Sequence, residues 1–413
     1  MCDPRSVSGL GGTYWRLWSA AGLSSLADGV LKVALPLIAV GYTRSPVLIA
    51  GLAFAFSLPW LLFALPAGAL VDRLDRRRAM LTANVLRGGL LAGVLLLTVL
   101  GGGSIWALYV VALGAGSAET VYDTAAQSIV PQVVGRTRLA RANGRMYAVE
   151  QTANEFAGPP LAGLLAAAGA GAAFGTPVVL WAAAVAVLLL VRGPYRVPRD
   201  GRTTLRADIA EGLRFLWHHK VLRTFTVMVG AFNFATGATF AVLVLHAVGP
   251  GSAMGLSAPA FGLLMASVAA GSLAGSFLAE PVERRLGRVR ALWVSWLAGG
   301  LTVGVLAVTA DPYAVGVVFF AGGAGLLVSN VVMVSLRQRL TPDRLLGRLN
   351  SSHRLVAWGT KSLGALAGGA IAQAAGLHAV FVLMGVLALG AVAGLSGVTE
   401  DVLAAAERDA VTR

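Results

Sequence analysis

The chain contains few charged residues. Asp, Glu, Lys and Arg together account for 13% of its 413 residues, whereas soluble domains carry about a quarter. Hydrophobic residues account for 57% of the chain. Because a surface that faces water needs more charge than this, the composition excludes an ordinary soluble domain and predicts an integral membrane protein.

Cysteine is nearly absent, since Cys2 is the single one. One cysteine excludes an internal disulfide and a metal site built from cysteines. His218 and His219 have no cysteine or carboxylate pattern beside them, so we predict no metal and no cofactor. The sequence has no Gly-x-x-x-x-Gly-Lys-Ser/Thr loop, which argues against ATP as the energy source. No nucleophile with a neighbouring base stands out, so we do not predict an enzyme.

Glycine, in contrast, is abundant. It accounts for 52 of the 413 residues, against an average share of about 7%. No collagen-like period accompanies this enrichment. In lipid, small residues let helix backbones approach closely, so the glycines favour a bundle of tightly packed membrane helices.

Long apolar segments recur along the chain, and each is long enough to cross a membrane, for which about 20 residues are needed. They are residues 15–41, 47–71, 79–100, 105–129, 143–168, 173–191, 222–247, 259–281, 290–309, 312–335, 352–375 and 378–398. The sequence therefore predicts an all-α membrane protein with twelve transmembrane helices.

Basic residues concentrate in the connections that follow even-numbered spans. Eight of them lie between Arg192 and Arg223, whereas Arg44 is the one basic residue in the connections after odd-numbered spans. Positively charged loops stay in the cytoplasm, so we expect both termini on the cytoplasmic side of the cell's inner membrane. The net charge of +14 then reflects topology, and we do not predict nucleic-acid binding.

The two halves of the chain resemble each other. "DRLDRRRAM" after span two matches "RRLGRVRAL" about 212 residues later, and "NGRMYAVEQTANEFAGPPLAG" entering span five resembles "NSSHRLVAWGTKSLGALAGG" entering span eleven. Such a repeat predicts two pseudo-symmetric six-helix bundles with a substrate site between them. We place the N-terminal bundle at residues 1–192 and the C-terminal bundle at 222–400.

The longest connection, residues 193–221, is predicted as a cytoplasmic linker. Its segment "LRADIAEGLRFLWHHK" places four apolar residues on one helical face, so we expect an amphipathic helix in the headgroup region. These residues are Leu205, Ile209, Leu213 and Leu216. Residues 401–413 are predicted as a cytoplasmic tail.

The segment "GALVDRLDRRRAM", residues 68–80, resembles the motif Gly-x-Leu-x-Asp-Arg-x-Gly-Arg-Arg that major facilitator superfamily transporters carry between spans two and three. It departs from that motif at Asp75, where glycine is usual. "ADGVLKVALPL" and "LRQRLTPDRLLGRLNSSHRLVAWG" are similar to the export subgroup that contains the enterobactin exporter and macrolide-efflux-type proteins. The resemblance covers residues 14–398. The matching motif positions are Gly68, Leu70, Asp72, Arg73, Arg76 and Arg77.

This resemblance implies a latch at the cytoplasmic side, formed by Gly68, Asp72, Arg73, Arg76, Arg77 and Asp123. Small Gly68 lets two helices meet closely, and the Asp72 carboxylate suits the positive N-terminal end of a neighbouring helix. The family implies that this neighbour is span eleven and that Arg76 pairs with Asp123. In the alternative interpretation, the arginines only set topology and contact lipid phosphates.

"GPPLAG" in span five resembles part of the family's antiporter motif. Pro159 removes a backbone donor and bends the helix, while Gly158 and Gly163 allow close packing beside the bend. The upstream glycines of the full motif are missing, because Asn154 stands at one of their places. An ordinary kinked helix is the alternative interpretation.

Span one contains two opposite charges, Asp28 and Lys32. Asp28 lies 13 residues beyond Trp15, which is about 20 Å along a helix. A carboxylate at that depth must be paired, protonated or wetted by a cavity. In one interpretation Asp28 and Lys32 form a closed structural pair. In the other, Asp28 is a proton site that is loaded on one side of the membrane and released on the other.

Further carboxylates lie inside the predicted spans. Glu119 and Asp123 are one turn apart in span four, and Glu155 lies in span five. We predict Asp28, Glu119 and Glu155 as candidates for proton coupling. Asp123 is assigned to the latch.

Other polar residues are candidates for the substrate cavity. They are Lys32, Asn233 and Asn330, and the two asparagines are equally suited to helix–helix hydrogen bonds. The arginine that many proton-antiport relatives carry in span four is absent, and Arg87 in span three is only a weak substitute.

We therefore expect a transporter that exports a small, largely apolar molecule by alternating access, driven by proton entry. The cargo would be a drug, a siderophore or another secondary metabolite. Its other partners would be protons and membrane lipid, and we expect a monomer. Two alternatives stay open: an importer or lipid flippase on the same scaffold, and a non-transporting membrane protein that recruits partners through the linker helix.

Overall fold

A computed structural model describes most of the chain. The described residues are 10–135, 138–193, 195, 214–341 and 343–411. Within helices, some side chains lie outside this description, namely those of residues 64–73, 140, 343, 344, 346–348, 350, 351, 354 and 409–411.

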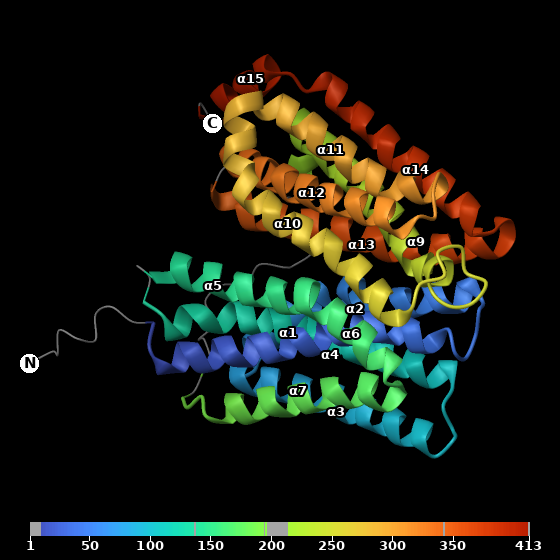
Figure 1. Ribbon diagram of the computed structural model, residues 1–413. Helices are drawn as coiled ribbons and strands as arrows, with labels where there is room; N and C mark the ends of the chain where they lie inside the picture. The colour runs from blue at the N-terminus through green and yellow to red at the C-terminus, as the bar shows by residue number, and fades with distance from the viewer. Residues whose placement is uncertain (1–9, 136–137, 194, 196–213, 342, 412–413) are drawn as a thin grey trace, which may run out of the picture. The chain divides into compact units, whose positions relative to one another are not determined.

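The described residues form long helices (Figure 1), as expected in lipid, where a helix satisfies all of its own backbone hydrogen bonds. The helices that precede the linker are α1 Gly12–Ala39, α2 Pro46–Arg73, α3 Arg76–Val99, α4 Ile105–Val133, α5 Leu139–Gln151, η3 Thr152–Ala157, α6 Gly158–Ala167 and α7 Ala170–Leu189. Those that follow it are α9 Lys220–Ala247, α10 Ala258–Leu286, α11 Arg288–Gly304, η4 Val305–Ala307, α12 Pro312–Leu340, α13 Asp343–Ala375, α14 Leu377–Val392, η5 Ala393–Gly397 and α15 Glu400–Val411.

Within the described part of the chain, ten helices are long and apolar enough to cross a membrane. They coincide with ten of the predicted spans, and their ends differ from the prediction by a few residues. The other two predicted spans correspond to α13, which carries Lys361 and several arginines, and to α5, η3 and α6 in succession. The prediction of an all-α membrane protein is confirmed.

The fifth predicted span is divided by a π-helix, η3, at Thr152–Ala157. Pro159 and Pro160 follow directly, and neither can donate a backbone hydrogen bond to the preceding turn. A wider turn accommodates the carbonyls left without these donors, and π-turns inside helices mark functional sites. The bend predicted around Gly158 and Pro159 therefore takes the form of a local change of helix type.

The chain divides into two compact units. The first consists of Met1–Tyr42 and Leu62–Asp200, and the second of Thr43–Leu61 and Gly201–Arg413. Helix α2 thus contributes its beginning to the second unit and its end to the first. The predicted bundle boundaries stay a prediction, because most of the 193–221 linker lies outside the described residues.

Each unit has its own apolar core. In the first unit the core includes Leu17, Met80 and Ile129, and in the second it includes Leu292, Leu336 and Leu403. Of the predicted amphipathic linker face, Leu205, Ile209 and Leu213 lie outside the described residues, while Leu216 is buried in the core of the second unit.

The last helix is a feature that the sequence analysis does not predict. Residues 401–413 were assigned to a tail, but Glu400–Val411 form α15. Leu403 of α15 is fully buried in the core of the second unit. Most of the predicted tail is therefore an element of that unit.

Candidate functional site

An ion pair between α1 and α3 lies in the interior of the first unit. Arg87 of α3 is fully buried, and Asp28 of α1 is 4% exposed. Arg87 Nη1 donates to Asp28 Oδ1 at 2.6 Å and to Oδ2 at 2.8 Å. A buried charge without a partner is strongly destabilising, so each of these two groups depends on the other for its place in the core.

Polar and aromatic side chains fix the Arg87 guanidinium in position. Its Nη2 donates to Ser24 Oγ at 3.0 Å and to Asn84 Oδ1. The rings of Tyr122 and Trp181 lie 4.8 and 5.2 Å from its central carbon, where a cation is attracted to an aromatic face. Arg87 is thus held on several sides.

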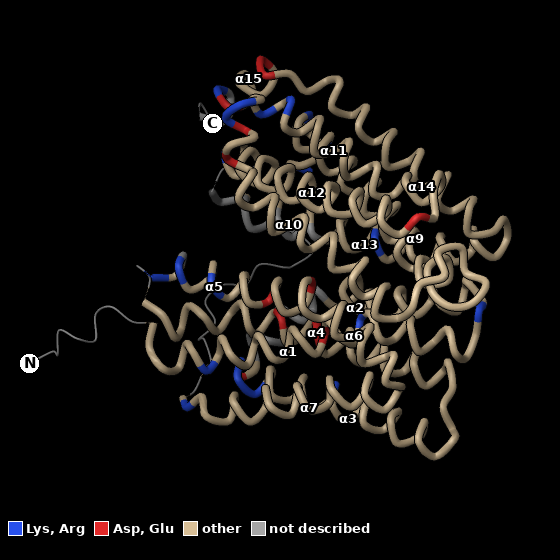
Figure 2. Tube along the Cα trace, viewed as in Figure 1, with Lys and Arg blue, Asp and Glu red and all other residues tan. Residues whose placement is uncertain are grey.

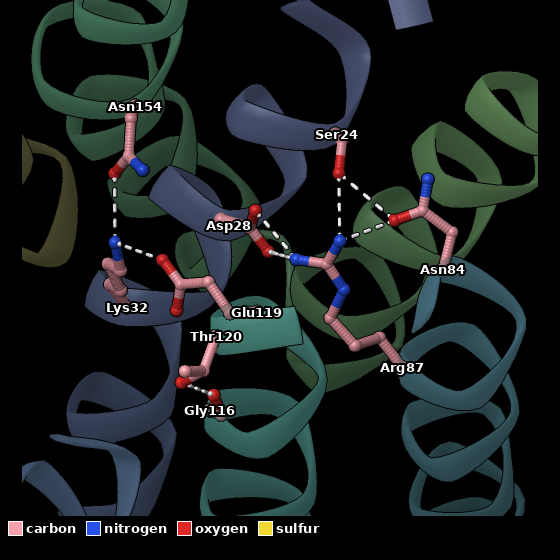
Figure 3. Close-up of polar contacts among 9 residues, drawn as sticks. All are labelled: Ser24, Asp28, Lys32, Asn84, Arg87, Gly116, Glu119, Thr120 and Asn154. Atoms are coloured by element: carbon pink, nitrogen blue, oxygen red, sulfur yellow. Dashed lines mark hydrogen bonds and ion pairs between the residues drawn. The ribbon is translucent and has the colours of Figure 1, made fainter. Parts of the chain in front are cut away.

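A second ion pair joins α1 to α4. Lys32 Nζ lies 3.0 Å from Glu119 Oε1, and it also donates to Asn154 Oδ1 at 3.4 Å (Figure 3). The Lys32 side chain is 32% exposed and that of Glu119 is 7% exposed. The other carboxylate oxygen, Glu119 Oε2, is buried and has no hydrogen-bond partner in the described structure. In this pair, the Lys32 side chain is therefore partly exposed, and the Oε2 atom of Glu119 is an acceptor without a described hydrogen bond.

The two pairs bring four charges together, and we call Asp28, Lys32, Arg87 and Glu119 the charged cluster. Figure 3 shows them side by side, Asp28 turned to Arg87 and Lys32 to Glu119. The direct pair of Asp28 with Lys32, one of the two interpretations above, does not form. Asp28 and Lys32 each have a partner on another helix instead, and the two acids and two bases of the cluster balance.

Sequence reasoning missed the surroundings of Arg87. Ser24 lies one turn before Asp28, and Asn84 one turn before Arg87, so both face the ion pair from its own helices. Polar residues one helical turn from a buried charge indicate candidate hydrogen-bond partners of that charge, so Ser24 and Asn84 could have been found from the sequence. The contacts of Tyr122 and Trp181 carried no such signal, since both sit on other helices.

The remaining carboxylates of the first unit lie outside these pairs. Asp123 is half-buried on α4 and Glu155 is exposed in η3. Figure 2 shows acidic residues midway along the helices around α1 and α4, and not only at helix ends. The roles of Glu155 in coupling and of Asp123 in the latch stay predictions.

Only part of the predicted latch can be described. Gly68, Asp72 and Arg73 fall in α2, but their side chains lie outside the described residues. Arg77 donates from Nε to the Leu188 carbonyl at 2.9 Å and from Nη2 to the Leu189 carbonyl at 3.1 Å. It thus binds the carbonyl end of α7, where a cation is favourable.

Arg76 is 6% exposed, and its backbone N–H donates to the Tyr195 carbonyl at 3.3 Å. Its predicted side-chain pairing with Asp123 stays a prediction.

Asp75, the departure from the family motif, has a local function. Its carboxylate accepts from the backbone N–H groups of Arg78 at 3.0 Å and Tyr195 at 2.8 Å. The first bond caps α3, and the second fastens the segment after α7. Burial raises the pKa of Asp75, but the hydrogen bonds from Tyr195 and Arg78 outweigh it and leave the pKa below its usual value.

The predicted kink lies against α1. Gly158, Pro159 and Gly163 are all buried. A Cβ added to Gly158 would lie 2.7 Å from the backbone of Gly29, and one added to Gly29 would collide with the backbone of Asn154. These glycines therefore allow η3 and α6 to approach α1 closely at the turn between Asp28 and Lys32.

The predicted cavity residues of the second unit are less informative. Asn233 is half-buried on α9, and Asn330 is exposed on α12. Their predicted contact with cargo stays a prediction.

Solved structures similar to this chain include transporters. A bacterial homologue of the iron transporter ferroportin in its inward-facing state matches with a TM-score of 0.72 and 17% identity over 93% of this chain and 98% of that one. The nucleoside transporter NupG matches with a TM-score of 0.71 and 12% identity over 94% of this chain and 98% of that one. Such low identity establishes the fold alone, which is that of a major facilitator transporter.

In sequence, the multidrug efflux pump Tap of Mycolicibacterium fortuitum is 27% identical over 398 residues, which cover 91% of this chain and 93% of the pump. The enterobactin exporter EntS of Salmonella typhimurium is 28% identical over 292 residues, which cover 68% of this chain and 67% of the exporter. The chain matches the transmembrane secretion effector family over residues 10–410 and belongs to it. It is a multi-pass membrane transporter and not an enzyme.

Proposed function

We propose that the chain exports a small, largely apolar molecule by alternating access and that proton entry through the charged cluster drives each cycle. Two relatives that cover most or two thirds of the chain are named an efflux pump and an exporter. Ionisable groups buried within membrane helices cost free energy and are kept where a function needs them. The charged cluster therefore supports a proton pathway.

The observation that carries the proposal is the state of Glu119. Its Oε1 pairs with Lys32, while Oε2 is buried and accepts no hydrogen bond from the residues that the structure describes. A proton placed on such an oxygen breaks no existing hydrogen bond. Asp28, in contrast, binds Arg87 through both oxygens, so a proton there must displace two hydrogen bonds. We therefore assign the exchangeable proton to Glu119, and to the Asp28–Arg87 pair the task of anchoring α1 to α3.

Protonation of Glu119 changes the charge balance of the cluster. With all four groups ionised the cluster is neutral, whereas a proton on Glu119 removes the negative charge that faces Lys32 in this pair. A buried net charge is unfavourable, so the Lys32 amine turns toward water through its 32% exposed side. The bond between α1 and α4 is then broken, and this is the step that couples proton binding to helix movement.

Transport assays on purified protein in vesicles test this assignment. The cargo is first chosen from dyes, macrolides and siderophores as a compound that accumulates less in cells with the protein than in cells without it. Greater accumulation in cells with the protein would instead indicate an importer. Glu119→Gln should abolish uptake driven by an imposed pH gradient but retain cargo binding, because the amide keeps the shape and cannot ionise.

The matched control is Asp311→Asn. Asp311 is an exposed acid that caps α12 by accepting from the Tyr313 and Ala314 N–H groups, and asparagine caps a helix equally well. This variant should transport like the unsubstituted protein. Gradient-driven uptake that survives Glu119→Gln would refute the proposed proton site.

We also infer that both termini and the basic loops face the cytoplasm, on the basis of the distribution of arginine. A reporter enzyme that requires the cytoplasm should be active when fused after residue 413. Activity of a periplasmic reporter at that position would contradict the orientation.

A further inference from the structure

The turn between α2 and α3 is fastened by an acid of its own. Asp75 accepts from Arg78 N–H at the start of α3 and from Tyr195 N–H in the segment after α7. The Arg76 N–H returns a hydrogen bond to the Tyr195 carbonyl at 3.3 Å. One carboxylate thus ties the turn to the segment that follows the last helix of the first unit.

The repeated turn in the second unit lacks this acid. In the alignment of "DRLDRRRAM" with "RRLGRVRAL", Gly287 stands at the place of Asp75 and Arg288 at that of Arg76. Gly287 has a φ of +79°, which residues with a side chain rarely adopt. It also gives α11 no side-chain cap. The backbone conformation at Gly287 therefore disfavours an aspartate at this place, such as Asp75 in the first unit.

Helix α15 supplies the missing carboxylate. Glu400 Oε1 accepts from Val289 N–H at 3.0 Å, and Glu400 Oε2 lies 3.4 Å from Arg288 Nε. The acid thus occupies the N-terminal end of α11, where negative charge is favourable. In both units, the segment after the last membrane helix is bonded to the repeated turn. In the first unit the carboxylate belongs to the turn, whereas in the second unit it belongs to α15, the segment after the last membrane helix.

A second acid of α15 strengthens the attachment. Glu407 Oε1 lies 2.7 Å from Arg288 Nη1 and 3.6 Å from Arg339 Nη1, so it joins the start of α11 to the end of α12. Leu403, between the two acids, is fully buried in the core of the second unit. Helix α15 is therefore held by Leu403, with Val402 and Ala406 packed beside it, and by the two acids.

The ion pairs of α15 are accessible to water. A cavity of about 990 Å³ lies beside them and is lined by Arg288, Arg339, Glu400 and Glu407 among others. Ions in solution weaken charge pairs of this kind. The hydrogen bonds that Asp75 accepts from backbone N–H groups in the first unit are less sensitive to salt, because the donor carries no net charge.

We propose that α15 is a clamp on the α10–α11 turn and that Glu400 and Glu407 are its positioning residues. The clamp holds the ends of α10, α11 and α12 together, as Asp75 holds the corresponding turn of the first unit. The ion pairs of α15 are solvated, so α15 can separate from the α10–α11 turn. The α2–α3 turn of the first unit stays bonded under the same conditions.

Hydrogen exchange of backbone amides, measured by mass spectrometry on the full chain in lipid nanodiscs, tests the clamp. Exposed ion pairs are individually weak, so Glu400→Gln and Glu407→Gln should each speed exchange in residues 402–411 and 288–291 by about two- to five-fold. Asp401→Asn is the matched control, because Asp401 is exposed on the same helix and has the same charge. It should leave exchange unchanged.

Two further comparisons make the outcome decisive. High salt should speed exchange of α15 in the unsubstituted protein but not exchange of residues 76–79 in the first unit. The double variant Arg288→Gln with Glu407→Gln should speed exchange by less than the product of the two single effects, because both single changes remove the same Arg288–Glu407 pair. If the Glu400 and Glu407 variants exchange like Asp401→Asn, or if α15 is unprotected in the unsubstituted chain, the clamp does not exist.

A functional consequence rests on the proposed export activity. Glu407→Gln should lower the maximal export rate without changing the cargo concentration at half-maximal rate, because the proposed proton site belongs to the other unit. Failure of export itself would leave the exchange results intact, so the two proposals can fail separately.

Discussion

At the scale of single residues, each ion of the charged cluster is stabilised by a partner from another helix. Arg87 shows this most clearly, because its guanidinium is fully buried and bonded to Asp28, Ser24 and Asn84. Removal of one partner from such a group leaves an uncompensated charge in the core. The cost of breaking the pair therefore exceeds the net stability that the pair contributes.

We expect Arg87→Gln to destabilise the protein by about 3–5 kcal/mol, because it leaves Asp28 buried and unpaired. Asp28→Asn added to the same variant should recover most of that loss, since no charge then remains without a partner. Thermal unfolding of the two single variants and the double variant measures this. Losses that simply add in the double variant would show that the two groups do not interact.

Asp75 gives a prediction about pH. The pKa of Asp75 in the folded protein lies below the usual value. The stability that Asp75 contributes is therefore fully present above about pH 4, which is the pKa of this carboxyl in the unfolded chain. This stability is lost as the pH falls through the pKa of Asp75 in the folded protein. Asp75→Ala should therefore destabilise the protein by about 0.5–2 kcal/mol at neutral pH. The difference in unfolding temperature between the two proteins should stay constant from pH 5 to 8 and shrink below about pH 4. A difference that grows in acid would contradict the assigned hydrogen bonds.

At the scale of elements, the most informative feature is the π-helix η3 against α1. It follows from two consecutive prolines, and it places Asn154 within hydrogen-bonding distance of Lys32. Close contact between Gly158 and Gly29 is what brings these elements together. The packing at this contact thus sets the position of Lys32.

Gly158→Ala should disrupt this contact. The added Cβ would lie 2.7 Å from the Gly29 backbone, which cannot move aside like a side chain, so we expect a loss of about 1–3 kcal/mol and slower transport. Gly93→Ala on α3 is the control, because its Cβ would meet nothing within 4 Å. Equal stability of the two variants would argue against a tight α1–α6 contact.

Sequence reasoning predicted the membrane helices well, because apolar length and glycine content are local properties. It did not predict which helix faces which. The spacing of Asp28 and Lys32 left a pair within α1 as one of two interpretations, whereas the partners are Arg87 and Glu119 on α3 and α4. Helix α15 was missed for a related reason, since only a few apolar residues, chiefly Leu403 and Val402, attach this charged and alanine-rich segment to the core.

At the scale of the whole molecule, the chain is a transporter of two units, and the charged cluster belongs to the first while the α15 clamp belongs to the second. The two turns that repeat between the units are fastened differently, one by a carboxylate in the turn and one by carboxylates from α15. Proton exchange and adjustable fastening are therefore assigned to different units.

The central claim is that Glu119 carries the exchanged proton. It is tested most directly by counting protons released into weakly buffered solution when cargo binds to the purified protein near pH 7. The unsubstituted protein and Asp311→Asn should release protons on binding, and Glu119→Gln should bind the same cargo and release none. Proton release by Glu119→Gln equal to that of the unsubstituted protein would contradict the claim.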